Sequence, residues 1–131
     1  MTQILKNKKG VTLIELLAVV VILGIIAAIA VPTIGGLIDR QEQRAAEATW
    51  TTIEEQAKVY AENTDPFSIQ DLEDDEFVDL KTNVFSFDGT VAVDAADIYV
   101  VVSGGVVSVY SDALGTVGTD LYINGHLVYE D

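Results

Sequence analysis

The sequence predicts an α+β protein, in which a long N-terminal α-helix packs on a C-terminal antiparallel β-sheet. An uncharged apolar run covers residues 16–38, and residues 39–63 continue with the three- and four-residue spacing of an amphipathic helix. Turn signals of two residues each then divide the C-terminal part into short apolar segments that are typical of strands. The sequence has no Cys, which excludes disulfide bonds and thiol chemistry.

The apolar run is long enough to cross a membrane. Its 23 residues would extend about 35 Å as an α-helix, against a hydrocarbon core of roughly 30 Å. Lysines precede the run and Asp39 follows it, so the positive-inside rule places the N-terminus in the cytoplasm. Between residues 11 and 38 the only charged side chain is Glu15. A carboxylate is costly at membrane depth, which predicts that Glu15 has a partner.

Two other interpretations of the run stay open. A secretory signal peptide could be cleaved after Ala30, because Ala28 and Ala30 fit a small-x-small site. Against it, Glu15 interrupts a region that should be purely apolar, and the apolar pattern continues to residue 38. The other interpretation is a plain membrane anchor, in which Glu15 reaches towards the headgroups and has no partner.

A specific motif surrounds the start of the run. In order it consists of Lys8-Lys9-Gly10, Val11, Thr12-Leu13-Ile14-Glu15, a long apolar stretch and Pro32. By these residues the chain resembles the type IV pilin and pseudopilin family over residues 6–40, with Val11 where the family most often has Phe. Residues 16–24 are similar to those of pilins from Gram-positive bacteria.

The resemblance implies the pilin fold and a processed subunit. Residues 1–10 would be a basic leader peptide that a prepilin peptidase removes between Gly10 and Val11, and the new amine of Val11 would be N-methylated. Residues 11–38 would form the transmembrane and filament-core helix, and residues 39–63 its amphipathic half. Glu15 would pair with the Val11 amine of a neighbouring subunit, which can fix the register between helices.

The resemblance also implies partners and a location. The subunit would wait in the cytoplasmic membrane as a single-pass protein, until an assembly ATPase and platform proteins extract it into a helical homo-oligomeric filament on the cell surface. In such filaments this helix is often locally unwound. Gly24 and Pro32 bracket a weak stretch, because Gly disfavours helix and Pro lacks an N–H donor. A mild kink in a continuous helix is the alternative.

The amphipathic segment has one apolar stripe. Its members are Ala46, Trp50, Ile53, Ala57, Tyr60 and Ala61. Charged residues lie mostly off this stripe, and Glu54 and Lys58 form an i,i+4 pair in the favourable order. We expect Trp50 and Tyr60 in the core rather than at a binding site, and we expect Pro66 to end the helix just before it.

Residues 64–131 are interpreted as an acidic connecting loop followed by the β-sheet head. The acidic stretch at 71–79 is expected to be a solvated loop or a short helix. Calcium binding is the alternative, and its candidate ligands are Asp71, Glu73, Asp74 and Asp75. The stretch does not fit an EF-hand, because Glu76 and Thr82 stand where Gly and Glu are required.

Turn signals predict the antiparallel strands. Asp88-Gly89 separates residues 84–87 from 90–93, Gly104-Gly105 separates 98–103 from 106–110, and Asn124-Gly125 separates 121–123 from 126–129. Not all three need be hairpins. A sheet built from these strands would bury its inner face against the apolar stripe of the helix. The single His126 lies in a turn with no Cys or second His nearby, which disfavours a metal or catalytic role.

Charge excludes further function classes. The chain has 21 acidic and seven basic residues and a formal net charge of −14, and removal of the leader would leave four basic residues. Such a chain should repel nucleic acid, so no direct nucleic-acid binding is expected. No Ser/His/Asp order, phosphate-binding Gly loop or nucleotide fingerprint is present, so neither an enzyme nor a cofactor is expected.

These observations favour a structural subunit of a type IV pilus filament that serves adhesion, motility or DNA uptake. The alternative within the family is a major pseudopilin of a type II secretion or competence system. The alternative of another class is a membrane-anchored or secreted acidic binding module, which would show no cleavage at Gly10 or would be cleaved after Ala30.

Overall fold

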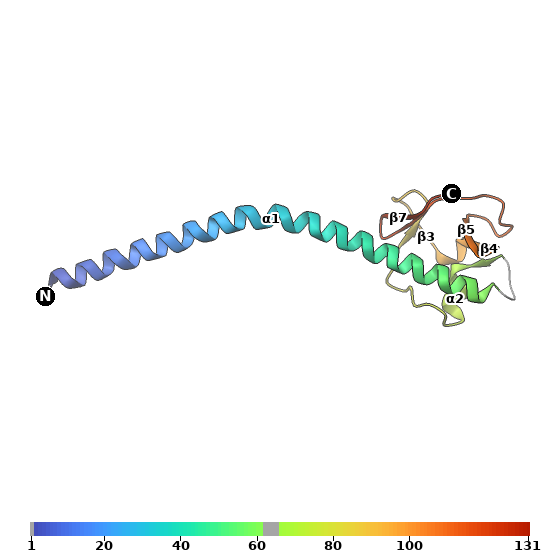
Figure 1. Cartoon of the computed structure of the whole chain (residues 1–131), viewed down its shortest axis with the longest axis horizontal. Helices are drawn as coiled ribbons and strands as arrows, with labels where there is room; N and C mark the ends of the chain where they lie inside the picture. Colours follow the sequence, from blue (N-terminus) through green and yellow to red (C-terminus); the bar gives the residue numbers. More distant parts are fainter. Residues whose placement is uncertain (1, 62–65) are drawn as a thin grey trace. The chain divides into compact units, whose positions relative to one another are not determined.

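The computed structural model of the protein describes residues 2–61 and 66–131, with side chains from Thr12 onward. It divides into two compact units, the helical unit Met1–Arg40 and the head unit Gln41–Asp131. In chain order the elements are α1 (Thr2–Tyr60), β1 (Phe67–Ser68), α2 (Ile69–Asp74), β2 (Phe85–Ser86), β3 (Ala92–Val93), η1 (Ala95–Asp97), β4 (Tyr99–Ser103), β5 (Val106–Tyr110), β6 (Leu121–Ile123) and β7 (His126–Tyr129). A long N-terminal helix with antiparallel sheets confirms the predicted α+β class (Figure 1).

Helix α1 runs without interruption through both predicted weak points, Gly24 and Pro32. Thr33 is one of several hydroxyl residues that bond back to the helix, and its Oγ1 donates to the carbonyl of Ile29 at 2.9 Å. The single chain therefore has the continuous helix of the two alternatives, while unwinding inside a filament stays a prediction. The helix ends at Tyr60, and Asn63, the predicted end, lies outside the described residues.

The core of the head unit forms around the predicted apolar stripe of α1. Ile53 and Ala57 are completely buried, and Ala46 and Trp50 are 1% and 8% exposed. They pack in one cluster with residues of both sheets and of α2, among them Leu72, Val109 and Leu121. Trp50 also meets Tyr129 with the ring centroids 5.6 Å apart. Because an amphipathic helix gains stability mainly by burying its apolar face, this cluster is what holds residues 41–60 against the strands.

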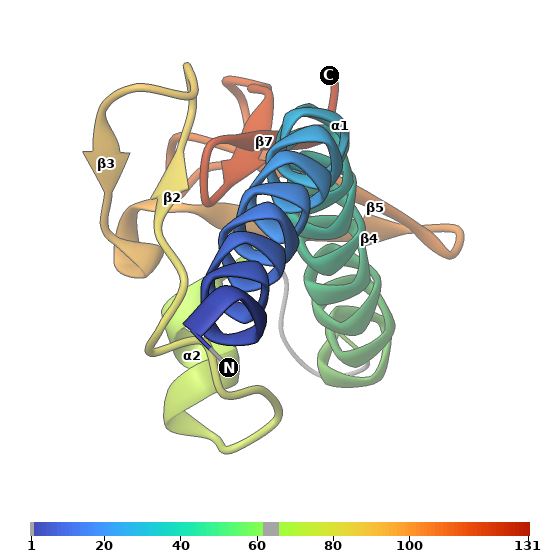
Figure 2. The same cartoon turned by 90° about the vertical axis from the view of Figure 1, so that its left-hand side faces the viewer.

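The strands form two sheets rather than the single sheet that we expected. One has the order β1-β4-β5 and the other the order β3-β2-β6-β7, and all pairs are antiparallel. In Figure 2, β2 and β3 run side by side while β4 and β5 make a separate hairpin. A single sheet was expected because strand β1, which pairs with β4, has only two residues and gives no periodic signal in the sequence. In addition, β2 pairs with β6, which is far from it in the chain.

Two of the three turn signals are confirmed as two-residue hairpins. Ser103 pairs with Val106 across Gly104-Gly105, and Ile123 pairs with His126 across Asn124-Gly125. Both central residues have positive φ in each turn, as the type I′ geometry requires. The third was wrong as a two-residue turn, because Ser86 pairs with Ala92 and five residues intervene. There, Asp88 Oδ1 accepts from the N–H groups of Thr90 and Val91, which closes a longer turn.

The acidic stretch begins with the short helix α2, one of the two forms expected for it. Ser68 caps this helix, and its Oγ accepts from the Asp71 N–H at 3.1 Å while Asp71 Oδ2 accepts from the Ser68 N–H at 2.7 Å. This reciprocal capping box satisfies two backbone donors that a helix start otherwise leaves unpaired. Ile69 and Leu72 of α2 are completely buried, so the helix is fixed to the core from its inner side.

Candidate functional site: the exposed apolar helix and Glu15

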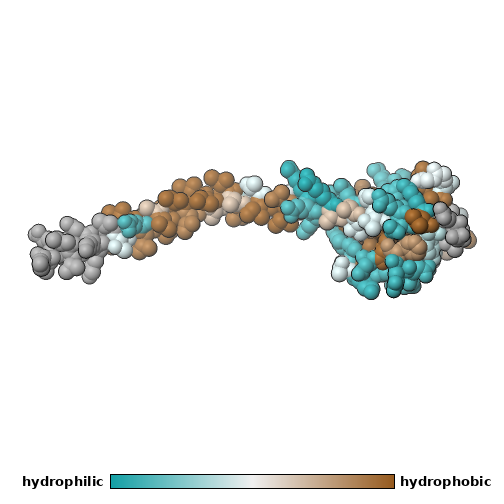
Figure 3. Space-filling model, turned by 60° about the horizontal axis from the view of Figure 1, so that its bottom comes forward, coloured by the Kyte–Doolittle hydropathy of each residue, from teal (hydrophilic) through white to brown (hydrophobic). Residues whose placement is uncertain are grey.

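The described side chains of the helical unit lie on the surface. Large hydrophobic residues between Leu13 and Ile38 are 47% to 71% exposed, and none of them is buried. Among the described residues, one helix is long and apolar enough to cross a membrane, and its mean hydropathy reaches 3.0. Figure 3 shows this apolar surface along the helical unit, in contrast to the hydrophilic surface that covers much of the head unit. So much exposed apolar area needs a membrane or other helices to cover it.

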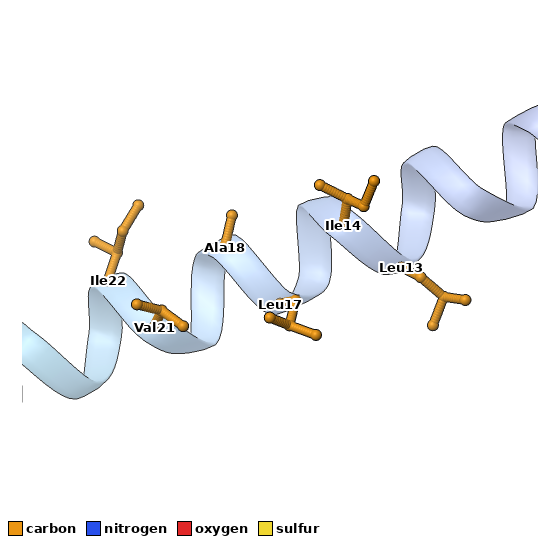
Figure 4. Close-up of a pocket in the computed structure, with 6 residues that line it drawn as sticks. All are labelled: Leu13, Ile14, Leu17, Ala18, Val21 and Ile22. Carbon is orange, nitrogen blue, oxygen red and sulfur yellow. The ribbon is translucent and has the colours of Figure 1, made fainter.

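Near the start of the described side chains the surface of α1 carries two parallel rows. Leu13, Leu17 and Val21 form one row at a spacing of four residues, and Ile14, Ala18 and Ile22 form the other (Figure 4). A shallow groove lined by these six residues lies between the rows. Rows at i±4 spacing are the ridges with which helices interdigitate, so this surface has the form of a helix-packing face.

Glu15 is exposed and follows directly after Ile14 of the second row. It makes no hydrogen bond or ion pair with any described side chain of the same chain. Gly10 and Val11 lie within α1, and the side chain of Val11 is outside the described part. In the uncleaved chain the nitrogen of Val11 is a neutral peptide nitrogen. That nitrogen would become a cationic amine only if the chain were cleaved after Gly10.

Residues 5–31 match the family model of the prokaryotic N-terminal methylation motif. The chain carries this methylation motif. The match covers Gly10, Val11 and Glu15, and it confirms the predicted resemblance to type IV pilins and pseudopilins over that segment. No solved structure matches the chain.

The methylation motif gives a coarse account of the chain. Its family is structural rather than catalytic, and the motif implies processing by a prepilin peptidase and pilus-type assembly. Together with the exposed apolar helix, the motif fits anchoring in a membrane before assembly.

The calcium candidates of the acidic stretch are engaged separately. Asp71 belongs to the capping box, Asp74 Oδ1 accepts from Gln70 Nε2 at 2.9 Å, and Asp75 Oδ2 accepts from the Tyr60 hydroxyl at 2.8 Å. Glu73 has a buried Oε1 that no described donor bonds, and Glu73 and Lys81 both line one cleft. Within the described residues the structure brings no three acidic or histidine side chains together as a metal site.

His126 lies beside Glu42, near the residue at which the head unit's part of α1 begins. Its Nε2 is 3.6 Å from Glu42 Oε2, which makes an ion pair when the imidazole is protonated. One helical residue further, Gln43 Nε2 donates to the Leu127 carbonyl at 3.3 Å. These contacts tie β7 to the helix, so the structure gives His126 a role in packing.

Sequence reasoning missed the two aspartates that organise loops. Val91 and Thr90 N–H groups lower the pKa of Asp88, and the Val117 N–H and Thr116 hydroxyl lower the pKa of Asp112, because each hydrogen bond favours the ionised carboxylate. The signal available beforehand was an Asp followed within a few residues by Gly and Thr, which is typical of turns closed by the Asp side chain.

Proposed function

We propose that the protein is a structural subunit of a type IV pilus filament, assembled through its hydrophobic helix and without catalytic activity. A prepilin peptidase removes residues 1–10, the amine of Val11 is methylated, and residues 11–38 then enter the filament core. An assembly ATPase and its platform proteins move the subunit out of the cytoplasmic membrane. The filament extends from the cell surface and serves adhesion, motility or DNA uptake.

One observation carries this proposal: among the described side chains Glu15 has no hydrogen-bond or ion-pair partner, and it directly follows Ile14 of a face suited to packing against other helices. A carboxylate enclosed by apolar helices is costly unless a cation meets it. The methylated amine of Val11 on a neighbouring subunit supplies that cation, and each subunit then offers one amine and one carboxylate. The pair neutralises both charges and sets the axial step between adjacent subunits.

The charge of the head unit supports an external position. It has 19 acidic residues against Arg44, Lys58 and Lys81, so it is strongly anionic. A surface with this net charge stays hydrated and opposes nonspecific association, which suits the outside of a filament.

Replacement of Glu15 by Ala tests the proposal. Filaments are sheared from the source cells and quantified, and the intact mass of the subunit is measured in the sheared and envelope fractions. We expect Glu15→Ala to insert into the membrane normally and to yield few or no filaments. Glu55→Ala is the matched control, because Glu55 is an exposed carboxylate on the same helix, and it should assemble as the wild type does. A normal yield of filaments from Glu15→Ala would contradict the assigned role.

The mass decides between the proposal and its alternatives. A mass that begins at N-methylated Val11, abundant in sheared filaments, is expected for a pilin. The same mass confined to the envelope fraction would assign the chain to a secretion or competence pseudopilus instead. A mass that begins at Val31 would exclude the filament and leave a secreted acidic domain.

A further inference from the structure

The hairpin β4–β5 has one buried and one outward face. Val100 and Val109 pair across it and are both completely buried, and Val107 is 4% exposed. Because side chains alternate along a strand, the residues between them point outward. The register pairs these outward residues as Tyr99 with Tyr110, Val101 with Ser108, and Ser103 with Val106.

The six outward residues of β4 and β5 are uncharged, although the unit around them is strongly acidic. A carboxylate borders them at one edge, where Asp131 lies against Gly118, the residue that pairs with Tyr110. Residues 98–119 include a single charged residue, Asp112, whereas the other 69 residues of the head unit include 21. A solvated strand face normally carries Lys, Glu or other charged groups. Here two tyrosines stand opposite each other, and tyrosine is one of the residues enriched at the energetic centres of protein interfaces.

A rigid loop extends the uncharged face. Asp112 accepts from the N–H groups of Thr116 and Val117 and from the Thr116 hydroxyl, which closes the loop on itself. Gly115, with φ of 64°, lies directly against Val101, where a side chain would find no room. Donors of its own loop therefore occupy the carboxylate of Asp112.

The same loop holds a large apolar side chain in water. Leu114 is 81% exposed, Val117 is 55% exposed, and Val106 on the adjoining hairpin is 64% exposed. Among the described residues of both units, no other large hydrophobic side chain is as exposed as Leu114. An apolar residue that is held outward by a hydrogen-bonded loop loses little conformational freedom on binding, which favours a contact there.

We propose that this uncharged face, made of the outward side of β4–β5 and the tip of the loop at 112–117, is where the head unit contacts the head of a neighbouring copy in the filament. The proposal deepens the proposed function and rests on it. The charge distribution identifies the occupant as a second copy. Two heads that each carry a large negative charge repel each other least where few carboxylates face the contact. A basic partner would instead favour the acidic surfaces elsewhere on the unit.

The test places a carboxylate at two valines of equal exposure. Val106 in the proposed contact and Val91 outside it are both 64% exposed, so Val106→Glu and Val91→Glu make the same chemical change at comparably solvated positions. A carboxylate buried without a partner in a contact lowers assembly about tenfold or more, because such a charge costs more than the roughly 1.4 kcal/mol that corresponds to one decade. We expect this loss in sheared filaments for Val106→Glu and a yield close to wild type for Val91→Glu.

Two further measurements check that a loss of filaments comes from the contact and not from misfolding. The fluorescence of Trp50 in the detergent-solubilised full chain shows that both variants fold. The chain has no Cys, so Ser103→Cys introduces a single thiol, which should react with a maleimide before assembly and be protected in filaments. Thr82→Cys, at another exposed position, should react in both states.

The outcomes separate the two proposals. Normal filaments from Val106→Glu and an unprotected thiol at position 103, while Glu15→Ala still blocks assembly, would overturn the head contact and leave the proposed function standing. Equal losses from Val106→Glu and Val91→Glu would also overturn it, because the effect would then come from added charge alone. Absence of filaments from the wild-type chain would overturn both.

Discussion

The two halves of helix α1 differ in what covers their apolar residues. Between Leu13 and Ile38, large hydrophobic side chains are 47% to 71% exposed, whereas Ile53 and Ala57 in the head unit are completely buried. Both halves are helical and both are rich in apolar residues, but only the second is followed by strands that can pack on it. The first half must obtain its cover from lipid or from other chains.

The difference shows how one helix can serve two surroundings. In the head unit the apolar residues recur every three or four positions and leave a charged face for water, while residues 16–38 are apolar on all sides. Residues on all sides of a helix cannot be covered by one sheet. An all-round apolar helix is therefore a sign of burial among several neighbours or in a membrane.

The largest expected effect comes from removing a buried side chain of the head unit. Ile53→Ala should lower the free energy of unfolding by about 2–5 kcal/mol, because it removes methyl groups and leaves a cavity. The matched control is Ile22→Ala in the helical unit, where the side chain is 56% exposed and the head should unfold as in the wild type. Urea unfolding followed by the fluorescence of Trp50, the one tryptophan, measures both. Equal destabilisation by the two variants would erase the contrast between the units.

Within the head unit, the capping box of α2 should matter less than the core. Ser68→Ala removes the hydroxyl that accepts from the Asp71 N–H, and loss of such a cap costs about 1 kcal/mol. The same urea titration checks it. Asp74→Ala is a suitable control, because Asp74 is exposed and bonds only to the Gln70 side chain of its own helix. A loss as large for Asp74→Ala as for Ser68→Ala would show that the cap has no special role.

The stability of the head unit should also depend on pH, through the loop that Asp112 closes. The pKa of Asp112 in the folded chain lies below its ordinary value, mainly because the Val117 N–H donates to the carboxylate. A group with a lowered folded pKa stabilises the fold above its unfolded pKa of about 3.9, and this contribution is lost as the pH falls through the folded pKa. Asp112→Asn should therefore show a shallower loss of stability below about pH 4 than the wild type, since its side chain does not titrate. Urea midpoints measured between neutral and acidic pH test this, and parallel curves would contradict it.

The smallest effect is expected from the surface ion pair of α1. Lys58 Nζ lies 3.2 Å from Glu54 Oε1, and the two side chains are 41% and 35% exposed. Lys58→Gln should change the free energy of unfolding by about 0.5 kcal/mol or less, because water screens such pairs. Measurement with and without 1 M salt, roughly enough to screen beyond 3 Å, should abolish the difference. A difference that survived in salt would assign Lys58 another contact.

Much of the fold follows from local patterns in the chain. The apolar stripe at Ala46, Trp50, Ile53 and Ala57 predicted the helix face that is buried, because helical spacing depends on residues three and four apart. Gly104-Gly105 and Asn124-Gly125 predicted their hairpins, since few residues other than these adopt positive φ without strain. The methylation motif was also readable, because its residues are contiguous.

Other features depend on residues far apart in the chain. The division into two sheets follows from pairings such as Phe85 with Ile123, and the short strand at Phe67–Ser68 exists because Val100 and Tyr99 lie beside it. The five-residue turn at Asp88 arises from side-chain bonds that compete with a tighter hairpin. The periodicity of the sequence predicts which side chains of a strand share a face. It does not predict which other strand pairs with it.

The sequence by itself determined the N-terminal motif, the single carboxylate of Glu15 on an apolar helix, and the buried stripe of the head, because each is set by spacing along one element. Only the tertiary structure decided that Tyr99, Tyr110 and Val106 share one outward face, and that the carboxylate of Asp112 accepts hydrogen bonds from its own loop. The register of β4 with β5 and the closing of that loop are cooperative results of packing. They bring the outward residues of both strands and the tip of the loop onto one surface.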